Sequence, residues 1–129
     1  MKLLLDTHAL LWWLADDPRL GRHARGLIEE PANDILISIA SLWEMAVKLR
    51  AGKLQADLAA VMDEAKREGF ITLGIAPAHL LALATLPMHH RDPFDHLLIA
   101  QAITEDAVFL SGDSNVSKYP VRSILCSSS

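Results

Sequence analysis

Four carboxylates lie at the ends of predicted strands or near the starts of predicted helices, where α/β proteins usually carry their functional residues. Asp6 and Asp113 each follow an apolar run, whereas Glu44 and Asp95 lie near the starts of helical stretches. Carboxylates that gather in one place repel one another and raise at least one pKa. A fold gains nothing from that arrangement unless a cation compensates the charge, and Mg²⁺ or Mn²⁺ are the natural partners of oxygen ligands.

A divalent ion held by carboxylates is well suited to phosphoryl chemistry. It activates water and stabilises the charge of a phosphoryl oxygen during an in-line displacement, so the four acids predict a phosphodiesterase or nuclease. Cys126 is the only cysteine, which excludes a Cys-based zinc site and an internal disulfide. His89 and His90 are adjacent and should point apart on a helix or strand, so we expect no competing histidine site.

Helix capping is the simpler explanation for each acid taken alone. Asp6 could cap the helix that follows it, and Ser41 and Glu44 have the spacing of a capping box. Asp92 precedes a proline, as is typical of a helix start, and for this residue the cap is favoured over a fifth metal ligand. Asp113 could cap a turn. For each acid taken alone, capping is favoured over a catalytic role by about two to one. The catalytic interpretation therefore depends on all four acids meeting at one edge of the sheet.

The elements that must position these acids alternate along the chain. The predicted strands cover residues 2–5, 34–38, 70–73, 107–110 and 121–125, and the predicted helices cover 8–15, 18–30, 41–50, 57–68, 77–86 and 93–104. This alternation predicts a single-domain, three-layer α/β/α fold with a central parallel sheet. Such sheets carry their sites beyond the carboxyl ends of the strands, where the four acids should meet. The domain is expected at residues 1–126, with 127–129 as a disordered tail.

Charge and hydropathy narrow the class of protein further. The 129 residues carry a net charge of −4, with 12 basic and 16 acidic side chains. Without the four candidate acids the charges balance, so a polyanionic substrate is not excluded, although no basic run predicts strong non-specific binding. No apolar run reaches the roughly 18 residues of a membrane span, and the N-terminus is a poor signal peptide. A cytoplasmic location is therefore expected.

Four stretches of the chain carry a family resemblance. They are residues 3–12 (LLLDTHALLW), 38–46 (SIASLWEMA), 90–102 (HRDPFDHLLIAQA) and 109–113 (FLSGD). In order and spacing, nearly the whole chain resembles the PIN-domain ribonucleases, and among them the VapC toxins of bacterial toxin–antitoxin pairs. The third stretch is the most specific. One departure is Gly112, because the family often has a basic or polar residue just before its last aspartate.

The resemblance implies a Mg²⁺-dependent (or Mn²⁺-dependent) endoribonuclease that acts as a toxin. The same four acids would be its catalytic and metal-binding residues, with Asp6 and Asp95 holding the first ion and a 5′-phosphate as the product. Thr7 and Ser41 could place hydroxyl groups near the metals or the phosphate, although capping is slightly favoured for both. The implied partners are RNA, a second copy of the chain, and an antitoxin that lays a segment into an apolar groove and blocks the acidic pocket.

RNA would have to be held by basic side chains around the pocket, and single-stranded or looped RNA is favoured over duplex. The candidates for phosphate contacts are Arg19, Arg22, Arg25, Lys48, Arg50 and Arg91. Solvated helix faces are the favoured alternative, by about two to one. The predicted helix 8–15 is apolar on nearly all sides, so it should be buried or covered by a partner.

Three other classes of protein are alternatives to a nuclease. A haloacid-dehalogenase-type phosphatase needs a second aspartate two residues after the first, where this chain has His8. A receiver-type signalling domain needs paired acids and a well-placed lysine, and neither is evident. A non-catalytic interaction module with an acidic pocket is the alternative from a different class, although all four acids are present.

Overall fold

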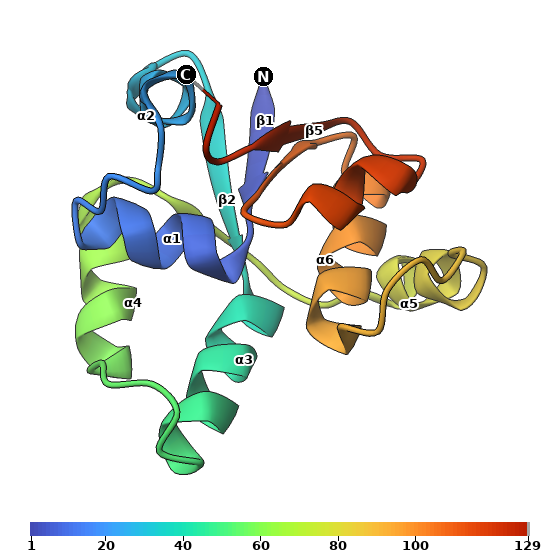
Figure 1. The fold of residues 1–129 in the computed structure, drawn as a ribbon, viewed down its shortest axis with the longest axis horizontal. Helices are drawn as coiled ribbons and strands as arrows, with labels where there is room; N and C mark the ends of the chain where they lie inside the picture. The colour runs from blue at the N-terminus through green and yellow to red at the C-terminus, as the bar shows by residue number, and fades with distance from the viewer. Residues whose placement is uncertain (129) are drawn as a thin grey trace.

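Five short apolar runs form one parallel sheet in the computed structural model, which describes residues 1–128 (Figure 1). The strands are β1 (Lys2–Leu5), β2 (Asp34–Ser38), β3 (Ile71–Leu73), β4 (Val108–Ser111) and β5 (Ser123–Leu125). Their order in the sheet is β3-β2-β1-β4-β5. All neighbours are parallel, so every strand ends at the same edge.

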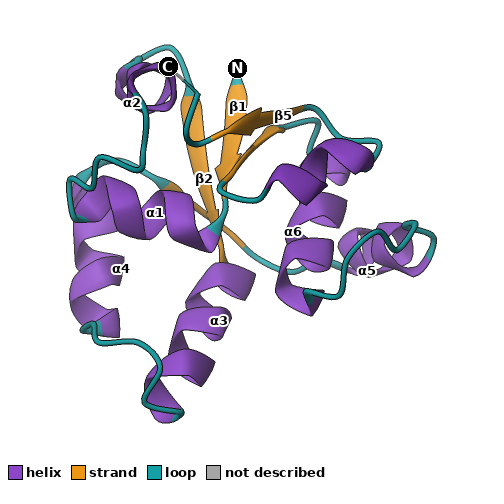
Figure 2. Ribbon diagram, viewed as in Figure 1, coloured by secondary structure: helices purple, strands orange, loops and turns teal. Residues whose placement is uncertain are grey.

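Helices cover both faces of this sheet (Figure 2). They are α1 (Thr7–Leu14), α2 (Arg22–Glu29), α3 (Ile39–Arg50), α4 (Leu58–Arg67), α5 (Pro77–Ala84) and α6 (Pro93–Thr104), with a short 3-10 helix, η1, at Ser114–Lys118. The helices α1, α2 and α4 pack on one face, and α5, α6 and η1 pack on the other. The predicted three-layer α/β/α fold is confirmed.

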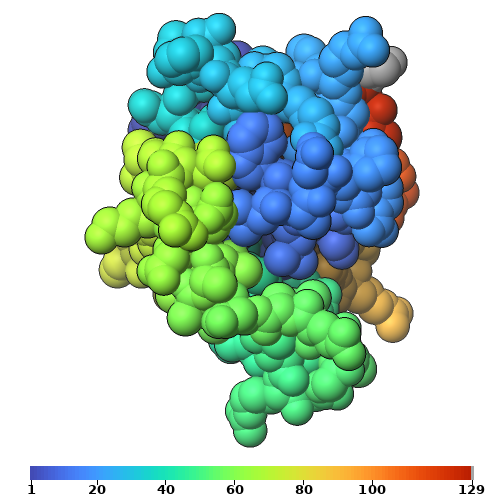
Figure 3. All heavy atoms as spheres, turned by 90° about the vertical axis from the view of Figure 1, so that its left-hand side faces the viewer, coloured from blue at the N-terminus to red at the C-terminus, as the bar shows by residue number. Residues whose placement is uncertain are grey.

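Alternation of side chains along each strand divides the interior into two cores. Leu3 and Leu5 of β1 face α1, α2 and α4, whereas Leu4 faces α6 together with Phe109 of β4. All four side chains are fully buried, as expected for strands that are covered on both sides. Figure 3 shows one covering layer, in which α1 (blue) and α4 (yellow-green) lie side by side.

The starts of two helices differ from the sequence prediction. Ser38, the last residue of β2, caps α3 directly, because its hydroxyl accepts the N–H of Ala40 at 2.9 Å. The prediction that α3 begins at Ser41, and with it the capping box, is therefore wrong. Helix α2 begins at Arg22 rather than at residue 18, because Asp17 holds the preceding residues in a turn by accepting the N–H of Arg19 at 2.9 Å.

The C-terminal residues pack against the loop before α2. The N–H of Gly21 donates to the carbonyl of Cys126 at 2.7 Å, and the N–H of Ser128 donates to Leu125 at 3.0 Å. A Cβ at Gly21 would collide with the carbonyl oxygen of Ser128. Residues 127 and 128, predicted as part of a disordered tail, therefore form a turn, while Ser129 lies outside the described residues.

A buried polar network ties the end of β2 to the helices on one face. The hydroxyl of Ser38 donates to Gln101 Oε1 at 2.5 Å, and Gln101 Nε2 donates to the carbonyl of Gly74 at 3.1 Å. His79 accepts a backbone N–H at Nδ1, which leaves Nε2 to donate to Glu105 at 2.9 Å. These bonds join α5 to α6 and join α6 to the carboxyl end of β2. Within residues 1–128, no helix is long and apolar enough to cross a membrane.

Candidate metal and active site

Five carboxylates line one cavity of about 330 Å³ at the carboxyl edge of the sheet. They belong to Asp6, Glu44, Asp92, Asp95 and Asp113. The structure thus brings the four predicted acids together, and it adds the acid that was expected to be mainly a helix cap. The topology explains why, since β1, β2 and β4 are adjacent and each runs into an element that carries one acid.

Asp6 is the most firmly held of these acids. Its Oδ1 accepts the N–H of Ala9 at 2.7 Å and caps α1, whereas its Oδ2 accepts from Ser111 Oγ at 3.0 Å and from the Gly112 N–H at 2.8 Å. Only 3% of the residue is exposed, and this burial raises the pKa of Asp6 although the hydrogen bonds oppose the shift. The carboxylate is fixed in one orientation before any ion arrives.

Glu44 reaches the cavity from the second turn of α3. The hydroxyl of Thr7 donates to its Oε1 at 2.6 Å, and Lys48 Nζ pairs with its Oε2 at 2.8 Å. The hydrogen bond to Glu44 raises the pKa of Lys48. Lys48 therefore neutralises part of the negative charge at the rim of the cavity, and its contact with RNA stays a prediction.

Asp95 is an acid of the cavity whose pKa lies near neutral pH. Burial raises its pKa to about 7, and the charge of Asp92 adds to the shift. Asp92 caps α6, because its Oδ1 accepts the N–H groups of Phe94 at 3.0 Å and Asp95 at 3.2 Å. The capping prediction for Asp92 is confirmed, and the residue still lies at the cavity wall.

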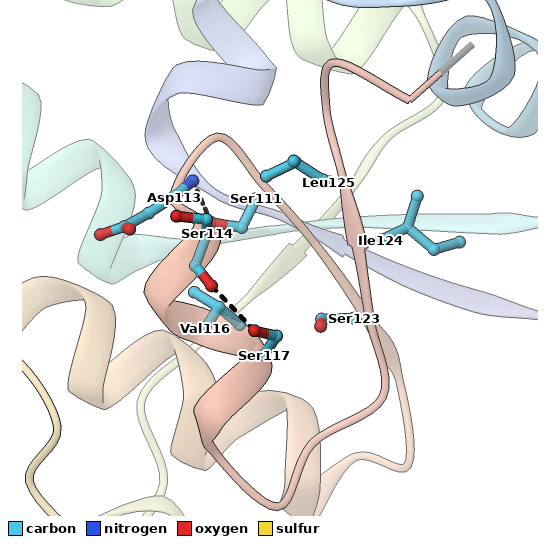
Figure 4. Close-up of a pocket in the computed structure, with 8 residues that line it drawn as sticks. All are labelled: Ser111, Asp113, Ser114, Val116, Ser117, Ser123, Ile124 and Leu125. Carbon is cyan, nitrogen blue, oxygen red and sulfur yellow. Dashed lines mark hydrogen bonds between the residues drawn. The ribbon is translucent and has the colours of Figure 1, made fainter.

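Asp113 closes the cavity from the loop after β4. Its Oδ1 accepts the N–H of Asn115 at 2.9 Å and caps η1, and its own N–H donates to Ser111 Oγ at 3.0 Å. A second pocket of about 220 Å³ lies beside it, between η1 and β5. Figure 4 shows that the Asp113 carboxylate points away from Ile124 and Leu125 on the far side of this pocket.

His90 is the residue that the sequence pattern did not place in the site. Its Nε2 lies 3.2 Å from Asp95 Oδ2 and 3.9 Å from Asp113 Oδ2. The argument that His89 and His90 point apart assumed a helix or strand, whereas His90 lies in the loop before α6, where its ring reaches two of the acids. Its position five residues before Asp95, at the start of the most specific family stretch, was the available signal.

The two predicted hydroxyl groups have different surroundings. Thr7 lies in the first turn of α1, lines the cavity and bonds Glu44, whereas Asp6 is the cap, so the capping interpretation of Thr7 is wrong. Ser41 is buried inside α3, and its hydroxyl has no hydrogen-bond partner among the described residues. It is not among the residues that line the cavity.

The predicted RNA contacts divide into near and distant groups. Arg19 stacks on Trp12 and, with Lys48, lines a groove next to the cavity. Arg25 is held by Asp16 and by backbone carbonyls. Helix α2, which carries Arg22 and Arg25, lies at the end of the sheet where β1 begins, away from the acids (Figure 1).

The remaining two basic candidates are exposed. Arg50 ends α3, and Arg91 lies in the loop next to Asp92. Arg91 is therefore the better placed of these two for contact with a substrate at the cavity.

The donor set fits a hard divalent cation. Every side chain that lines the acidic cavity offers oxygen ligands, apart from His8. Burial raises the pKa of both Asp6 and Asp95, which means that ionising both acids is unfavourable without a neighbouring positive charge. Mg²⁺ and Mn²⁺ supply that charge and prefer carboxylate oxygens.

A comparison with known families agrees with this geometry. The family model described as "PIN domain" matches residues 3–121. The chain belongs to the PIN domain family. The family prediction is confirmed, and membership of the PIN domain family supports the predicted nuclease activity.

Individual relatives of this PIN domain are similar over most of its length. Ribonuclease VapC22 from Mycobacterium tuberculosis is 30% identical over 103 residues, which are 78% of this chain and 78% of the relative. The structure of VapBC2 from Rickettsia felis bound to a promoter DNA fragment matches with a TM-score of 0.75 at 16% identity, over 97% of this chain and 98% of that one. VapBC-1 from nontypeable Haemophilus influenzae matches with a TM-score of 0.67 at 14% identity, over 99% and 100%.

The structure also explains why this PIN domain has Gly112 just before Asp113, where the family often has a basic or polar residue. A Cβ at this position would lie 3.0 Å from Cη2 of Trp12, which is closer than ordinary contact. The Gly112 N–H meanwhile donates to Asp6. The residue therefore lets the loop approach both α1 and the first acid of the site.

Proposed function

We propose that the protein is a divalent-metal-dependent endoribonuclease that acts as the toxin of a toxin–antitoxin pair. The observation that carries this proposal is the cavity lined by five carboxylates, in a chain of the PIN domain family. The name of the relative Ribonuclease VapC22 supports RNA as the substrate. The catalytic roles follow from the position of each acid in this cavity.

Asp6 and Asp95 are proposed to hold the first cation, and Glu44 and Asp113 complete the cluster directly or through water. When bound, Mg²⁺ or Mn²⁺ supplies activation of water and stabilisation of negative charge on the phosphate. The chain's own groups fix the ligands for this task. Hydrogen bonds orient Asp6 from three sides, and Lys48 offsets the charge of Glu44 at the rim.

A groove beside the cavity is proposed as the place where polymeric partners lie. It has a volume of about 600 Å³ and runs between α1, α3 and the segment after α3 (residues 53–56). It shares Thr7 and His8 with the acidic cavity. Figure 3 shows α1 (blue) above that segment (green). Arg19 and Lys53 lie among its lining residues, and Arg91 is a further candidate for phosphate contact.

An antitoxin is the proposed protein partner. Two structural neighbours are VapBC2 and VapBC-1, and the apolar part of the groove, with Leu11, Leu14 and Met45, suits a segment of another protein. A basic side chain of that segment could then reach the acidic cavity through the shared wall. Toxin action on RNA would take place in the cytoplasm.

A homodimer is also part of the proposal. Helix α3 exposes Ile39, Trp43 and Val47 at a spacing of four residues, which places them on one stripe. Helix α5 exposes Leu80 and Leu81. Apolar side chains that are exposed together in this way often mark a protein interface.

Cleavage of a mixed RNA pool tests the proposed activity. The wild type should cut RNA with Mg²⁺ or Mn²⁺ and should stop when the ions are chelated, whereas Asp6→Asn and Asp95→Asn should lose at least about 100-fold, as expected when a group that stabilises the transition state is removed. Asp63→Asn is a matched control, because this acid is exposed on α4. Equal cutting by wild type and site variants would refute the metal-site hypothesis, and no cutting under any ion would favour the interaction module.

A further inference from the structure

The ring of His90 is held more firmly than its place in a loop would suggest. Its Nδ1 lies 2.7 Å from Tyr119 Oη, and its own carbonyl oxygen accepts from His96 Nε2 at 2.7 Å. Tyr119 and His96 are 4% and 9% exposed, so both partners belong to the interior. The residue is therefore fixed through its ring and through its backbone.

Tyr119 also decides which nitrogen of His90 carries the proton. Its hydroxyl oxygen accepts two backbone N–H groups, from His89 at 2.9 Å and from His90 at 3.2 Å. A hydroxyl oxygen has two lone pairs, so both are occupied and its proton can go only to His90 Nδ1. Because Nδ1 accepts, the ring proton of His90 sits on Nε2.

This proton faces the acidic cavity. Nε2 lies 3.2 Å from Asp95 Oδ2 and 3.9 Å from Asp113 Oδ2. The ligand atoms of these three residues lie within 4.8 Å of one another, which by distance alone would also suit a metal bound through the imidazole. A nitrogen that carries a proton has no lone pair for a metal, so the hydrogen bond and not ligation accounts for this geometry.

We propose that His90, oriented by Tyr119, is a positioning residue: its Nε2–H hydrogen-bonds Asp95 beside Asp113 and holds the carboxylates in the arrangement that binds a divalent cation. His90 does not itself bind the metal. The inference rests on the proposed function and deepens it by naming the pair that sets the metal affinity. Carboxylate ligands are generally oriented by such outer partners, whose loss typically lowers metal affinity 10–100-fold.

Titration calorimetry with Mn²⁺ measures the expected effect without RNA. His90→Ala should bind Mn²⁺ 10–100-fold more weakly than the wild type, and His90→Gln, which keeps a donor at a similar reach, should recover most of the loss. Tyr119→Phe keeps the ring and removes the hydroxyl, so it should also weaken binding. His89→Ala is the matched control, because His89 is exposed and its ring contacts Tyr119 but no acid; it should bind as the wild type does.

Two spectroscopic readouts complement the calorimetry, and the first of them needs only the wild type. Nitrogen-15 NMR of the metal-free wild type should place the His90 ring proton on Nε2, and a proton on Nδ1 would overturn the inference. Pulsed electron paramagnetic resonance of the Mn²⁺ complex should show no coordinated nitrogen from His90. A coordinated nitrogen that His90→Ala abolishes would make His90 a ligand and overturn the positioning role.

The outcomes also separate this inference from the proposed function. If the wild type binds Mn²⁺ and His90→Ala binds it equally well, the positioning role is refuted while the metal site stands. If the wild type binds no Mn²⁺, the proposed function is refuted, and the positioning role with it.

Discussion

At the scale of single residues, the acids of this protein act both as helix caps and as candidate metal ligands. Asp6, Asp92 and Asp113 each accept a backbone N–H at the start of a helix. A capping carboxylate uses part of its acceptor capacity on the backbone and keeps the remainder for another partner. The cap therefore fixes the orientation of the candidate ligand. Helix capping and metal binding, which are alternative interpretations of each acid from the sequence, are compatible in the structure.

The pKa of Asp95 predicts how the metal-free protein responds to pH. Burial raises the pKa to about 7 from 3.8, so between these values the folded chain holds a proton that the unfolded chain has lost. The free energy of unfolding should therefore fall as pH rises from about 4 to 7 and then level off. Asp95→Asn removes the titrating group and should make this dependence shallower.

Urea unfolding in the presence of a chelator, at pH 5 and pH 8, measures this difference. The wild type should lose more stability between the two pH values than Asp95→Asn does. Identical losses in the two proteins would show that Asp95 titrates at its ordinary pKa in the fold.

The sequence predicted the residues of the site more completely than their local contacts. The four acids were predictable because Asp6 and Asp113 directly follow apolar strands, and Glu44 and Asp95 lie near the starts of helices, positions that meet at one edge of a parallel sheet. His90 was not, because its role depends on Tyr119, which lies 29 residues further along the chain. The cap of α3 was assigned to Ser41 instead of Ser38, because both serines precede or begin the same apolar helix and only the strand end distinguishes them.

At the scale of elements, the loop between β4 and η1 is the tightest part of the site. Gly112 lies against Trp12 of α1 and donates to Asp6, so the loop and the helix constrain each other. Helix α3 enters directly from β2 through Ser38, which also binds Gln101 of α6. The elements that carry the acids are thus joined to one another by hydrogen bonds and close packing.

Gly112→Ala should destabilise the fold and weaken metal binding together. The new Cβ would lie 3.0 Å from the Trp12 ring, and overpacking of this kind typically costs about 1–3 kcal/mol. If the loop or the Trp12 ring moved to relieve this contact, the hydrogen bond from the N–H of residue 112 to Asp6 would also be disturbed. Denaturant unfolding and Mn²⁺ titration of the same variant measure both effects.

Gly26→Ala is the matched control for this change. Gly26 lies in α2, and a Cβ there has no atom within 4 Å, so the substitution should stabilise the protein by up to about 1 kcal/mol through helix propensity. A Gly112→Ala variant as stable as Gly26→Ala would contradict the packing argument.

At the scale of the whole molecule, the fold was predictable because its pattern repeats. The apolar strands and intervening helices predicted the parallel sheet and its layers, and even β5 was predicted within a few residues. The pairing partner of each strand and the exact path from β2 into α3 depend on long-range packing, which the pattern does not contain. The groove beside the cavity could not be predicted from the sequence for the same reason, because α1, α3 and the segment after α3 form it together.

Bound metal should stabilise the whole domain, because only the folded chain assembles the cavity. At a free Mn²⁺ concentration 100 times the dissociation constant, linkage predicts a gain of about 2.7 kcal/mol in the free energy of unfolding. Thermal unfolding should show the gain in the wild type and in Asp63→Asn, and should show little of it in Asp6→Asn. A gain of equal size in Asp6→Asn would place the bound ion elsewhere on the molecule.

The central claim, that the acidic cavity is the metal site, is tested most directly by an anomalous difference map of crystals grown with Mn²⁺. The predicted result is a peak inside the cavity, within bonding distance of carboxylate oxygens of Asp6 and Asp95, that is absent from crystals of Asp95→Asn. A cavity that stays without a peak at saturating Mn²⁺, or a peak bound only by residues outside it, would contradict the account.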